Sequence, residues 1–282
     1  MRRQLLRAAA IQLNSGADKK KNLGLAERLA REAARSKAEL VVLPEKFNLI
    51  GDPERLRAGA ERIDGPTATW AAGISRELGI WLLAGSFAEL VSEDELLRNT
   101  SLLFGPDGEL HASYRKIHMF DVEVEGKQYR ESATEAPGTE IVLAGAGDLP
   151  LGMSVCYDLR FPELYRILAV RGARAFALPA AFTVPTGQAH WEVLIRARAI
   201  ENQAFVIAAG QVGAHPDGFE SYGHSVIVDP WGVVLASCST EEQAVIADLD
   251  LAEQDRVRER LPSLANRRPD KYLWSAVAGA AA

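Results

Sequence analysis

The spacing of hydrophobic side chains divides the first half of the chain into helices and strands. Apolar residues recur every three or four positions over residues 18–34 and 66–78, the spacing of one face of a surface helix. Gly79, directly after the second stretch, indicates where that helix ends. Short apolar runs bounded by polar residues predict strands over residues 5–13, 40–43, 80–87, 99–104 and 110–115.

The second half continues this alternation and then changes to hairpins. Helices are predicted over residues 161–170, 189–203 and 251–261, the first of them with Pro162 near its first turn, where proline is well suited. Strands are predicted over residues 149–155, 175–178, 204–210, 223–228, 233–237 and 244–249. The pattern predicts the α/β (or α+β) class, with mixed sheets and helices outside.

Turns and loops separate these elements. Gly105-Pro-Asp-Gly and Asp229-Pro-Trp-Gly have the composition of hairpin turns. Residues 117–138 are polar and irregular and are predicted to be a long loop, and residues 179–187 a shorter one. Long ordered loops in compact domains are often binding or lid segments, so the first loop is a candidate part of a site.

Composition and charge narrow the class of protein. The chain has 282 residues, 48% hydrophobic and 25% charged, as expected for a globular domain, here residues 1–275 with a loose tail at 276–282. A net charge of −6 without a basic block argues against nucleic acid or an anionic membrane as a partner. The apolar runs are also far shorter than the ~18 residues of a membrane span.

The chain contains two cysteines, Cys156 and Cys238, too few for a disulfide framework. Such usage fits a reducing compartment, so a cytoplasmic location is predicted, with a bridge between the two cysteines as the alternative. The sequence has no Cys and His cluster with zinc spacing, and no metal site is predicted.

Cys156 lies between a predicted strand and a predicted helix. A side chain at such a turn projects from the sheet edge close to the backbone N–H groups of a helix start, which favour negative charge. A thiol there is expected to lose its proton more easily and to act as a nucleophile. The alternative is a small buried hydrophobic residue, the usual state of a free cysteine.

Two further polar residues share this placement, since Glu45 follows the strand at 40–43 and Lys116 the strand at 110–115. Sites in α/β sheets collect at the carboxyl ends of strands. A carboxylate there can take a thiol proton, and an ammonium can stabilise an oxyanion. The alternatives are a solvated glutamate, a surface lysine, or a cysteine–histidine pair with a base among His118, His190, His215 and His224.

Three motifs in order give the chain a resemblance to the nitrilase superfamily of carbon–nitrogen hydrolases. They are Leu43-Pro-Glu-Lys-Phe-Asn, Tyr114-Arg-Lys-Ile-His-Met-Phe-Asp and Ser154-Val-Cys-Tyr-Asp-Leu-Arg-Phe-Pro-Glu. The resemblance implies a four-layer αββα sandwich of two mixed sheets with outer helices. It implies no metal or organic cofactor, and a homodimer that pairs through the helix after Cys156 and the helix at 189–203.

The resemblance also implies catalytic roles. Cys156 matches the nucleophile that forms a thioester, Glu45 the general base and Lys116 the cation that, with the backbone N–H of Tyr157, holds the oxyanion. The family's further glutamate, which positions the lysine and the substrate, falls on Glu131, with Glu135 as the alternative.

Two more segments, residues 186–203 and 221–232, resemble the Nit branch of the superfamily. This implies a small α-keto acid amide as substrate, first of all deaminated glutathione, cleaved to 2-oxoglutarate and cysteinylglycine, or else 2-oxoglutaramate. Arg160 is expected to bind the keto acid carboxylate, since a guanidinium fork suits a carboxylate, unless it pairs with Glu163. Phe182 and Thr186 match positions that line the same pocket.

Other functions stay open on the sequence alone. The same chemistry could act on an N-carbamoyl compound or a nitrile, because pocket contacts set specificity. A non-catalytic interaction protein is the alternative from another class, although a binding module has no need of Glu45, Lys116 and Cys156 together.

Overall fold

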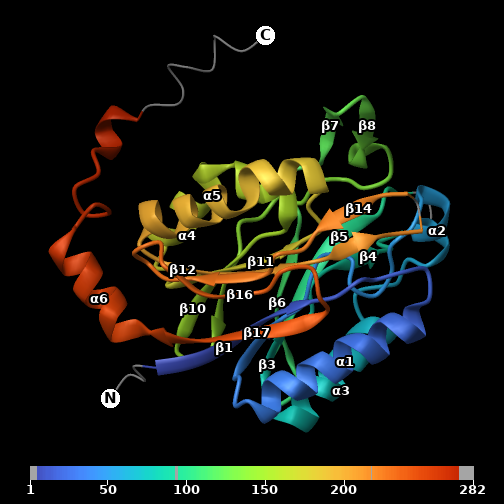
Figure 1. Ribbon diagram of the computed structural model, residues 1–282, viewed down its shortest axis with the longest axis horizontal. Coiled ribbons are helices and arrows are strands. Elements are labelled where there is room, and N and C mark those ends of the chain that lie inside the picture. The colour runs from blue at the N-terminus through green and yellow to red at the C-terminus, as the bar shows by residue number, and fades with distance from the viewer. Residues whose placement is uncertain (1–4, 93–94, 217, 273–282) are drawn as a thin grey trace.

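Two sheets pack face to face between two layers of helices, as the ribbon in Figure 1 shows. This computed structural model describes residues 5–92, 95–216 and 218–272, so the tail predicted at 276–282 lies outside the described residues. The mixed-sheet αββα sandwich confirms the predicted fold class.

The first sheet has three parallel strands in its centre, β1, β2 and β3, with antiparallel neighbours on both sides. Its order is β17-β1-β2-β3-β5-β4, and β6 pairs with the other side of β5. The strands are β1 (Leu5–Gln12), β2 (Leu40–Val42), β3 (Trp81–Leu83), β4 (Phe87–Glu89), β5 (Arg98–Phe104), β6 (Leu110–Arg115) and β17 (Gln243–Asp250).

The second sheet follows the same plan, with β10, β11 and β12 parallel and antiparallel strands at its edges. Its order is β16-β15-β12-β11-β10-β9. The strands are β9 (Leu143–Ala146), β10 (Leu149–Met153), β11 (Ala175–Ala180), β12 (Phe205–Gly210), β15 (Val226–Val228) and β16 (Val234–Ser237). A small hairpin beside it pairs β13 (Val212–Ala214) with β14 (Glu220–Tyr222).

Helices α1 and α3 cover the first sheet, and α4 and α5 cover the second, while α6 lies at the edge (Figure 1). The helices are α1 (Lys19–Arg35), α2 (Pro53–Ala58), α3 (Pro66–Leu78), α4 (Pro162–Val170), α5 (Val184–Asn202) and α6 (Leu251–Arg260), with 3-10 turns η1 (Glu131–Ala133), η2 (Cys156–Arg160) and η3 (Pro269–Lys271). Within the described residues, none of these helices combines the length and apolarity that a bilayer crossing requires.

The alternation along β1 explains why its sequence is apolar throughout. Ala8 and Ala10 point into the core between the sheets, whereas Ala9 and Ile11 point into the core under α1 and α3. Successive side chains of a strand face opposite sides, so a strand inside this sandwich must be apolar on both.

Helix α5 begins at Val184, five residues before the predicted start at 189, so the expected loop at 179–187 is wrong in its second half. Thr183 caps the helix by accepting a hydrogen bond from the backbone N–H of Thr186, and Pro185 lies in the first turn, where a missing N–H costs nothing. Gly187 indicated a loop, but it is required here because a Cβ would lie 2.3 Å from the Tyr222 ring.

The predicted loop at 117–138 contains a hairpin of β7 (Asp121–Val124) and β8 (Lys127–Arg130), which projects from the sandwich (Figure 1). Glu125 and Gly126 form its turn with φ of 49° and 77°. Two successive positive φ angles are typical of a type I′ hairpin turn. The sequence signal was weak because glutamate is a less usual first residue of that turn than asparagine or aspartate.

The strand predicted at 80–87 is divided between β3 and β4 by Gly85, which has φ of +38°. A Cβ on Gly85 would lie 1.9 Å from the Pro44 carbonyl oxygen, so only glycine permits this approach. The contact fixes the segment that carries Glu45. Farther along the chain, the strand predicted at 223–228 begins only at Val226.

Candidate active site

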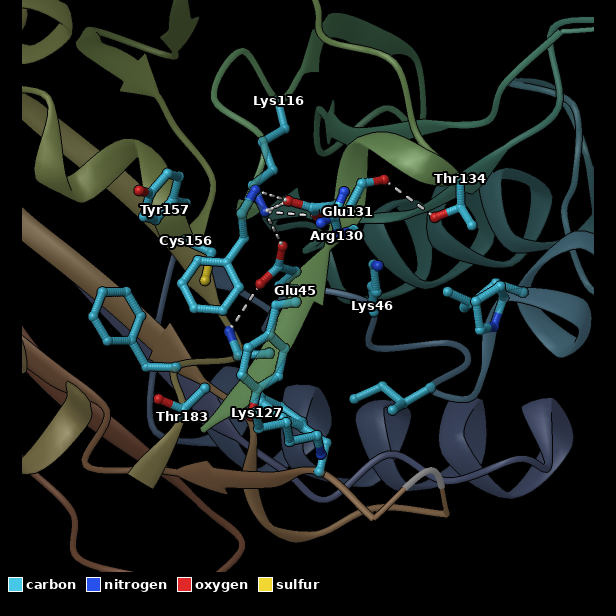
Figure 2. A pocket seen from close by; sticks show the side chains of 18 of the residues that line it. Glu45, Lys46, Lys116, Lys127, Arg130, Glu131, Thr134, Cys156, Tyr157 and Thr183 are labelled. Carbon is cyan, nitrogen blue, oxygen red and sulfur yellow. Dashed lines mark hydrogen bonds and ion pairs between the residues drawn. The ribbon is translucent and has the colours of Figure 1, made fainter. Parts of the chain in front are cut away.

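A pocket of about 400 Å³ lies where strand ends from the two sheets meet, and it is lined by Glu45, Lys116, Glu131 and Cys156. Glu45 follows β2, Lys116 follows β6, and Cys156 follows β10. Figure 2 shows these side chains pointing toward one another from separate segments of the chain. The structure thus brings together the acid, amine and thiol that the sequence places at strand ends.

Lys116 is the centre of the cluster. Its Nζ lies 3.0 Å from Glu45 Oε1 and 2.8 Å from each carboxylate oxygen of Glu131 (Figure 2). Burial alone would lower the pKa of Lys116, but the carboxylates of Glu131 and Glu45 outweigh it and hold that pKa well above its usual value. The amine is therefore a fixed cation inside the pocket.

The carboxylate of Glu45 is held at both oxygens. Oε1 accepts a hydrogen bond of 2.8 Å from Asn99 Nδ2 as well as the Lys116 contact, and Oε2 accepts one of 2.9 Å from the backbone N–H of Ala181. Ala181 directly follows β11 of the second sheet, so Glu45 joins the ends of both sheets. Its orientation toward Cys156 is fixed before any substrate arrives.

Glu131, rather than the alternative Glu135, contacts Lys116. Burial would raise the pKa of Glu131, but Lys116 and Lys46, with a 2.7 Å hydrogen bond from the Phe120 N–H, lower it to about 2. Glu135 is fully buried beside Lys46, 2.7 Å from its Nζ. Burial raises the pKa of Glu135 to about 7, with Glu131 adding to the shift and Lys46 opposing it.

Cys156 begins η2 with φ of 48°, a left-handed conformation that is uncommon for a side chain other than glycine. The pKa of its thiol lies well above the usual value because burial penalises the thiolate and the Glu45 carboxylate opposes a second negative charge, although Lys116 acts in the other direction. The expectation of easier deprotonation is therefore wrong for the free protein. Here the thiol hydrogen-bonds to Glu45 and needs a base.

Asp158 is a buried carboxylate that joins the turn carrying Cys156 to the segment carrying Lys116. Its Oδ2 accepts hydrogen bonds from the Tyr114 hydroxyl at 2.7 Å and from the Val155 N–H at 2.8 Å. Its Oδ1 lies 2.7 Å from His118 Nδ1 and accepts from the His118 N–H at 3.2 Å. These hydrogen bonds hold the two segments in one arrangement, although the residues that make them do not line the pocket.

Tyr157, expected to hold the oxyanion through its backbone N–H, also lines the pocket, as do the residues expected to bind substrate, Arg160, Phe182 and Thr186. The Arg160 guanidinium lies over the rings of Tyr157 and Phe182, 5.8 and 5.3 Å from their centroids, and donates to His190 Nδ1 at 3.3 Å. It forms no ion pair with Glu163 within the part of the chain that the structure describes.

Comparison with known proteins decides the family. Residues 7–259 match the model of the carbon–nitrogen hydrolase family. The chain belongs to this family. This carbon–nitrogen hydrolase is 42% identical to deaminated glutathione amidase of Bos taurus, over 94% of this chain and 82% of that protein. It is 40% identical to omega-amidase NIT2 of Mus musculus, over 94% of this chain and 96% of that one.

A solved structure supports the same assignment. Saccharomyces cerevisiae Nit3, described as a member of branch 10 of the nitrilase superfamily, superposes with a TM-score of 0.86 at 30% identity, over 95% of this chain and 97% of that chain. The resemblance to the nitrilase superfamily is confirmed, as is the class of activity, hydrolysis of carbon–nitrogen bonds other than peptide bonds in linear amides.

The four histidines considered as a base for Cys156 in this carbon–nitrogen hydrolase lie outside the pocket lining and form hydrogen bonds with other groups. His118 contacts Asp158, His190 contacts Arg160, His215 bonds to Ser15 and Ser221, and His224 to the Tyr222 carbonyl. None of the four lines the pocket, so the cysteine–histidine alternative has no support in the described residues. Both cysteines are free thiols. Across the described ranges, no group of three or more candidate ligands is arranged to hold a metal.

Sequence interpretation missed Asn99 and Asp158. Asn99 is the second residue of β5, and its amide donates to Glu45 and, at 3.4 Å, to Glu131, but an asparagine in a strand gives no signal of its partners. Asp158 could have been found, because it lies two residues after Cys156, and an aspartate in a tight turn often accepts a hydrogen bond from a backbone N–H of that turn. The backbone donors Phe120 and Ala181 could not be found from residue types at all.

Proposed function

We propose that this protein is a cysteine-nucleophile amidase acting on the linear amide of a small α-keto acid, with deaminated glutathione as its substrate. The observation that carries the proposal is the pocket in which the carboxylate of Glu45, the ammonium of Lys116 and the thiol of Cys156 meet. The substrate class is supported by the names of the two relatives, which act on deaminated glutathione and as an omega-amidase.

The first half-reaction acylates the cysteine. Cys156 Sγ attacks the amide carbonyl carbon while Glu45 takes the thiol proton, which suits a thiol whose pKa is high in the free enzyme. The developing oxyanion is stabilised by the Lys116 ammonium and the Tyr157 N–H. The carbon–nitrogen bond then breaks, the proton held by Glu45 passes to the leaving nitrogen, and the amine departs from a thioester.

The second half-reaction restores the enzyme. Glu45 takes a proton from a water molecule, whose oxygen attacks the thioester carbon. The carbon–sulfur bond breaks, the thiolate recovers the proton from Glu45, and the carboxylic acid leaves. Glu131 keeps Lys116 in place through both steps, because its two oxygens each contact Nζ at 2.8 Å.

Arg160 is proposed to bind the carboxylate of the keto acid. Its guanidinium lines the pocket, it is held against two aromatic rings, and it has no carboxylate partner in the described residues. A bidentate guanidinium–carboxylate contact would fix the acyl half of the substrate while the amide carbonyl lies at Cys156. Phe182 and Thr186 line the same side and limit the width of the acyl group.

A substrate panel tests the proposal by following 2-oxoglutarate release from deaminated glutathione and from 2-oxoglutaramate, with an N-carbamoyl amino acid and a nitrile assayed for ammonia. We expect the highest kcat/KM on deaminated glutathione, and no turnover by Cys156→Ala. A higher kcat/KM on 2-oxoglutaramate would keep the mechanism and change the substrate to that of an omega-amidase. No turnover of any α-keto amide by the folded wild type would reject the proposal and favour a non-catalytic protein.

We also propose that two chains pair through α4 and α5 in the cytoplasm. The outer faces of these adjacent helices expose large apolar side chains, Ile167, Val170, Val193 and Ile200, whose burial would favour association. The location is supported by the free state of both cysteines. Sedimentation velocity tests the pairing: the wild type should have the mass of two chains, and Val193→Arg should shift it to one. A wild type with the mass of one chain would contradict it.

A further inference from the structure

The cations that line the pocket fall into two groups. Lys116 faces Glu45 and Glu131, and Lys46 faces Glu135, so both of these charges are neutralised by the protein. Arg160, Lys127 and Arg130 also line the pocket, but none of the three has a carboxylate partner among the described residues. The protein therefore presents more positive charge to a bound molecule than one substrate carboxylate would use.

A row of aromatic rings separates Arg160 from Lys127. The Arg160 guanidinium lies 5.8 Å from the Tyr157 ring, which is 5.1 Å from the ring of Phe120. The Phe120 ring in turn lies 5.2 Å from that of Tyr129, and Lys127 Nζ lies 5.4 Å from the Tyr129 ring. All five residues line the pocket, so one wall of it is an aromatic surface with a cation at each end.

The nucleophile lies toward one end of this wall, because Cys156 immediately precedes Tyr157. An amide whose carbonyl carbon is at Cys156 has its acyl half near Arg160. Its leaving amine then extends along Phe120 and Tyr129 toward Lys127. Figure 2 shows Lys127 and Cys156 in different parts of the pocket, and Lys127 is the first residue of β8 in the projecting hairpin.

We propose that Lys127 forms a second anion subsite, which binds a carboxylate carried by the leaving amine. The inference rests on the proposed function and adds to it the chemical class of the leaving group: an extended amine with a terminal carboxylate, rather than ammonia. Cysteinylglycine, the amine released from deaminated glutathione, belongs to this class. A compact amide such as 2-oxoglutaramate reaches Arg160 but has nothing to place at Lys127.

The local structure suits this role. Lys127 Nζ donates one hydrogen bond, 3.2 Å long, to the carbonyl oxygen of Gly218, which holds the ammonium over the pocket and leaves two of its three N–H donors for a ligand. The ring of Phe219 lies 6.1 Å from that of Tyr129, so aromatic surface continues beside the ammonium. A charge-assisted hydrogen bond at such a rim contributes specificity through kcat/KM rather than through the chemical step.

The test compares two substrates that share the acyl half: deaminated glutathione and its C-terminal carboxamide, which lacks only the terminal negative charge. Wild type should prefer the carboxylate by about tenfold in kcat/KM, and Lys127→Gln should reduce this ratio to near one. Lys127→Arg, which keeps the charge, should retain most of the preference. Both substrates are assayed on the same protein, so any loss of folded enzyme cancels in the ratio.

Lys20→Gln is the matched control, since Lys20 is an exposed lysine on α1 outside the pocket, and it should keep the wild-type ratio. The preference of the wild type should also fall as salt is raised, because an exposed charge pair is screened. A ratio near one in wild type, or an unchanged ratio in Lys127→Gln, would overturn this subsite while leaving the amidase proposal intact. Failure of the wild type to cleave either compound would instead count against the proposed function.

Discussion

Glu131 and Glu135 lie four residues apart, the first largely and the second fully buried, and each faces a lysine, yet the pKa values of the two carboxyl groups differ widely. The pKa of Glu131 is lowered to about 2, and that of Glu135 is raised to about 7. Burial acts in the same direction on both, raising the pKa, so burial alone does not explain the difference.

The difference lies in the donors that each carboxylate receives. Glu131 has Lys116 at 2.8 Å on both oxygens and the Phe120 N–H at 2.7 Å, whereas the structure gives Glu135 an ion pair with Lys46 and no second donor among the described residues. Glu135 also experiences the negative charge of Glu131. A buried carboxylate thus stays ionised when several donors converge on it, and a single cation beside it is not enough.

The largest difference between the two ion pairs is expected when the lysine of each pair is replaced. Lys116→Met takes away both the proposed oxyanion cation and the partner of Glu131, and we expect kcat to fall by at least about 10³-fold. Lys46→Met, the matched change in the neighbouring pair, should lower kcat by less than about tenfold. Steady-state kinetics on the best substrate of the panel measures both, and equal losses would show that Lys116 has no special role.

A finer comparison changes only the glutamates. Glu131→Gln leaves a neutral amide beside Lys116, so the ammonium is less well held, and kcat should fall about 10²-fold. Glu135→Gln should change kcat by less than about threefold, since Glu135 does not line the pocket. Circular dichroism of the two variants serves as the check on folding. A larger loss for Glu135→Gln than for Glu131→Gln would reverse the assignment of the two residues.

The smallest expected effect is on stability as a function of pH. The pKa of Glu135 is higher in the folded state, about 7 against 4.5, so its contribution is fully present below pH 4.5 and is lost as pH rises through 7. Glu135→Gln should remove a decline on the order of 2 kcal/mol between these values. Glu131, with a folded pKa of about 2, contributes above pH 4.5 and loses this as pH falls toward 2.

Urea unfolding at pH 5 and pH 7.5 measures the first of these slopes for wild type, Glu135→Gln and Glu131→Gln. Glu131→Gln should keep only part of the wild-type slope, because the negative charge of Glu131 adds to the raised pKa of Glu135. The same slope in wild type and Glu135→Gln would mean that Glu135 does not titrate there.

Some residues of the candidate site could be predicted from the sequence and others could not. Glu45, Lys116 and Cys156 could be grouped because each follows a strand whose apolar run is plain, and strand ends collect at one edge of a sheet. The choice between Glu131 and Glu135 could not be made from spacing, since both lie in one irregular stretch. It depends on which carboxylate the backbone of Phe120 meets, and that is decided by tertiary structure.

Local sequence rules failed where residues served contacts distant in the chain. The loop predicted at 179–187 includes Pro185 and Gly187, but both belong to α5, where Gly187 packs against Tyr222. The raised pKa of Cys156 was likewise missed, because it comes first from burial of the thiol and then from the Glu45 carboxylate, and the residues around Cys156 in the sequence indicated only a helix start. Propensity describes neighbours along the chain, and these features arise from neighbours in space.

The contacts of Asp158 affect how the enzyme loses activity and tertiary structure on heating. The same carboxylate contacts the Tyr114 hydroxyl, the His118 ring and the Val155 N–H, so the turn that carries Cys156 and the segment that carries Lys116 share one buried hydrogen-bond partner. We expect heat that breaks these hydrogen bonds to release both segments together. Activity and tertiary structure should therefore disappear at one temperature, without a folded, inactive form in between.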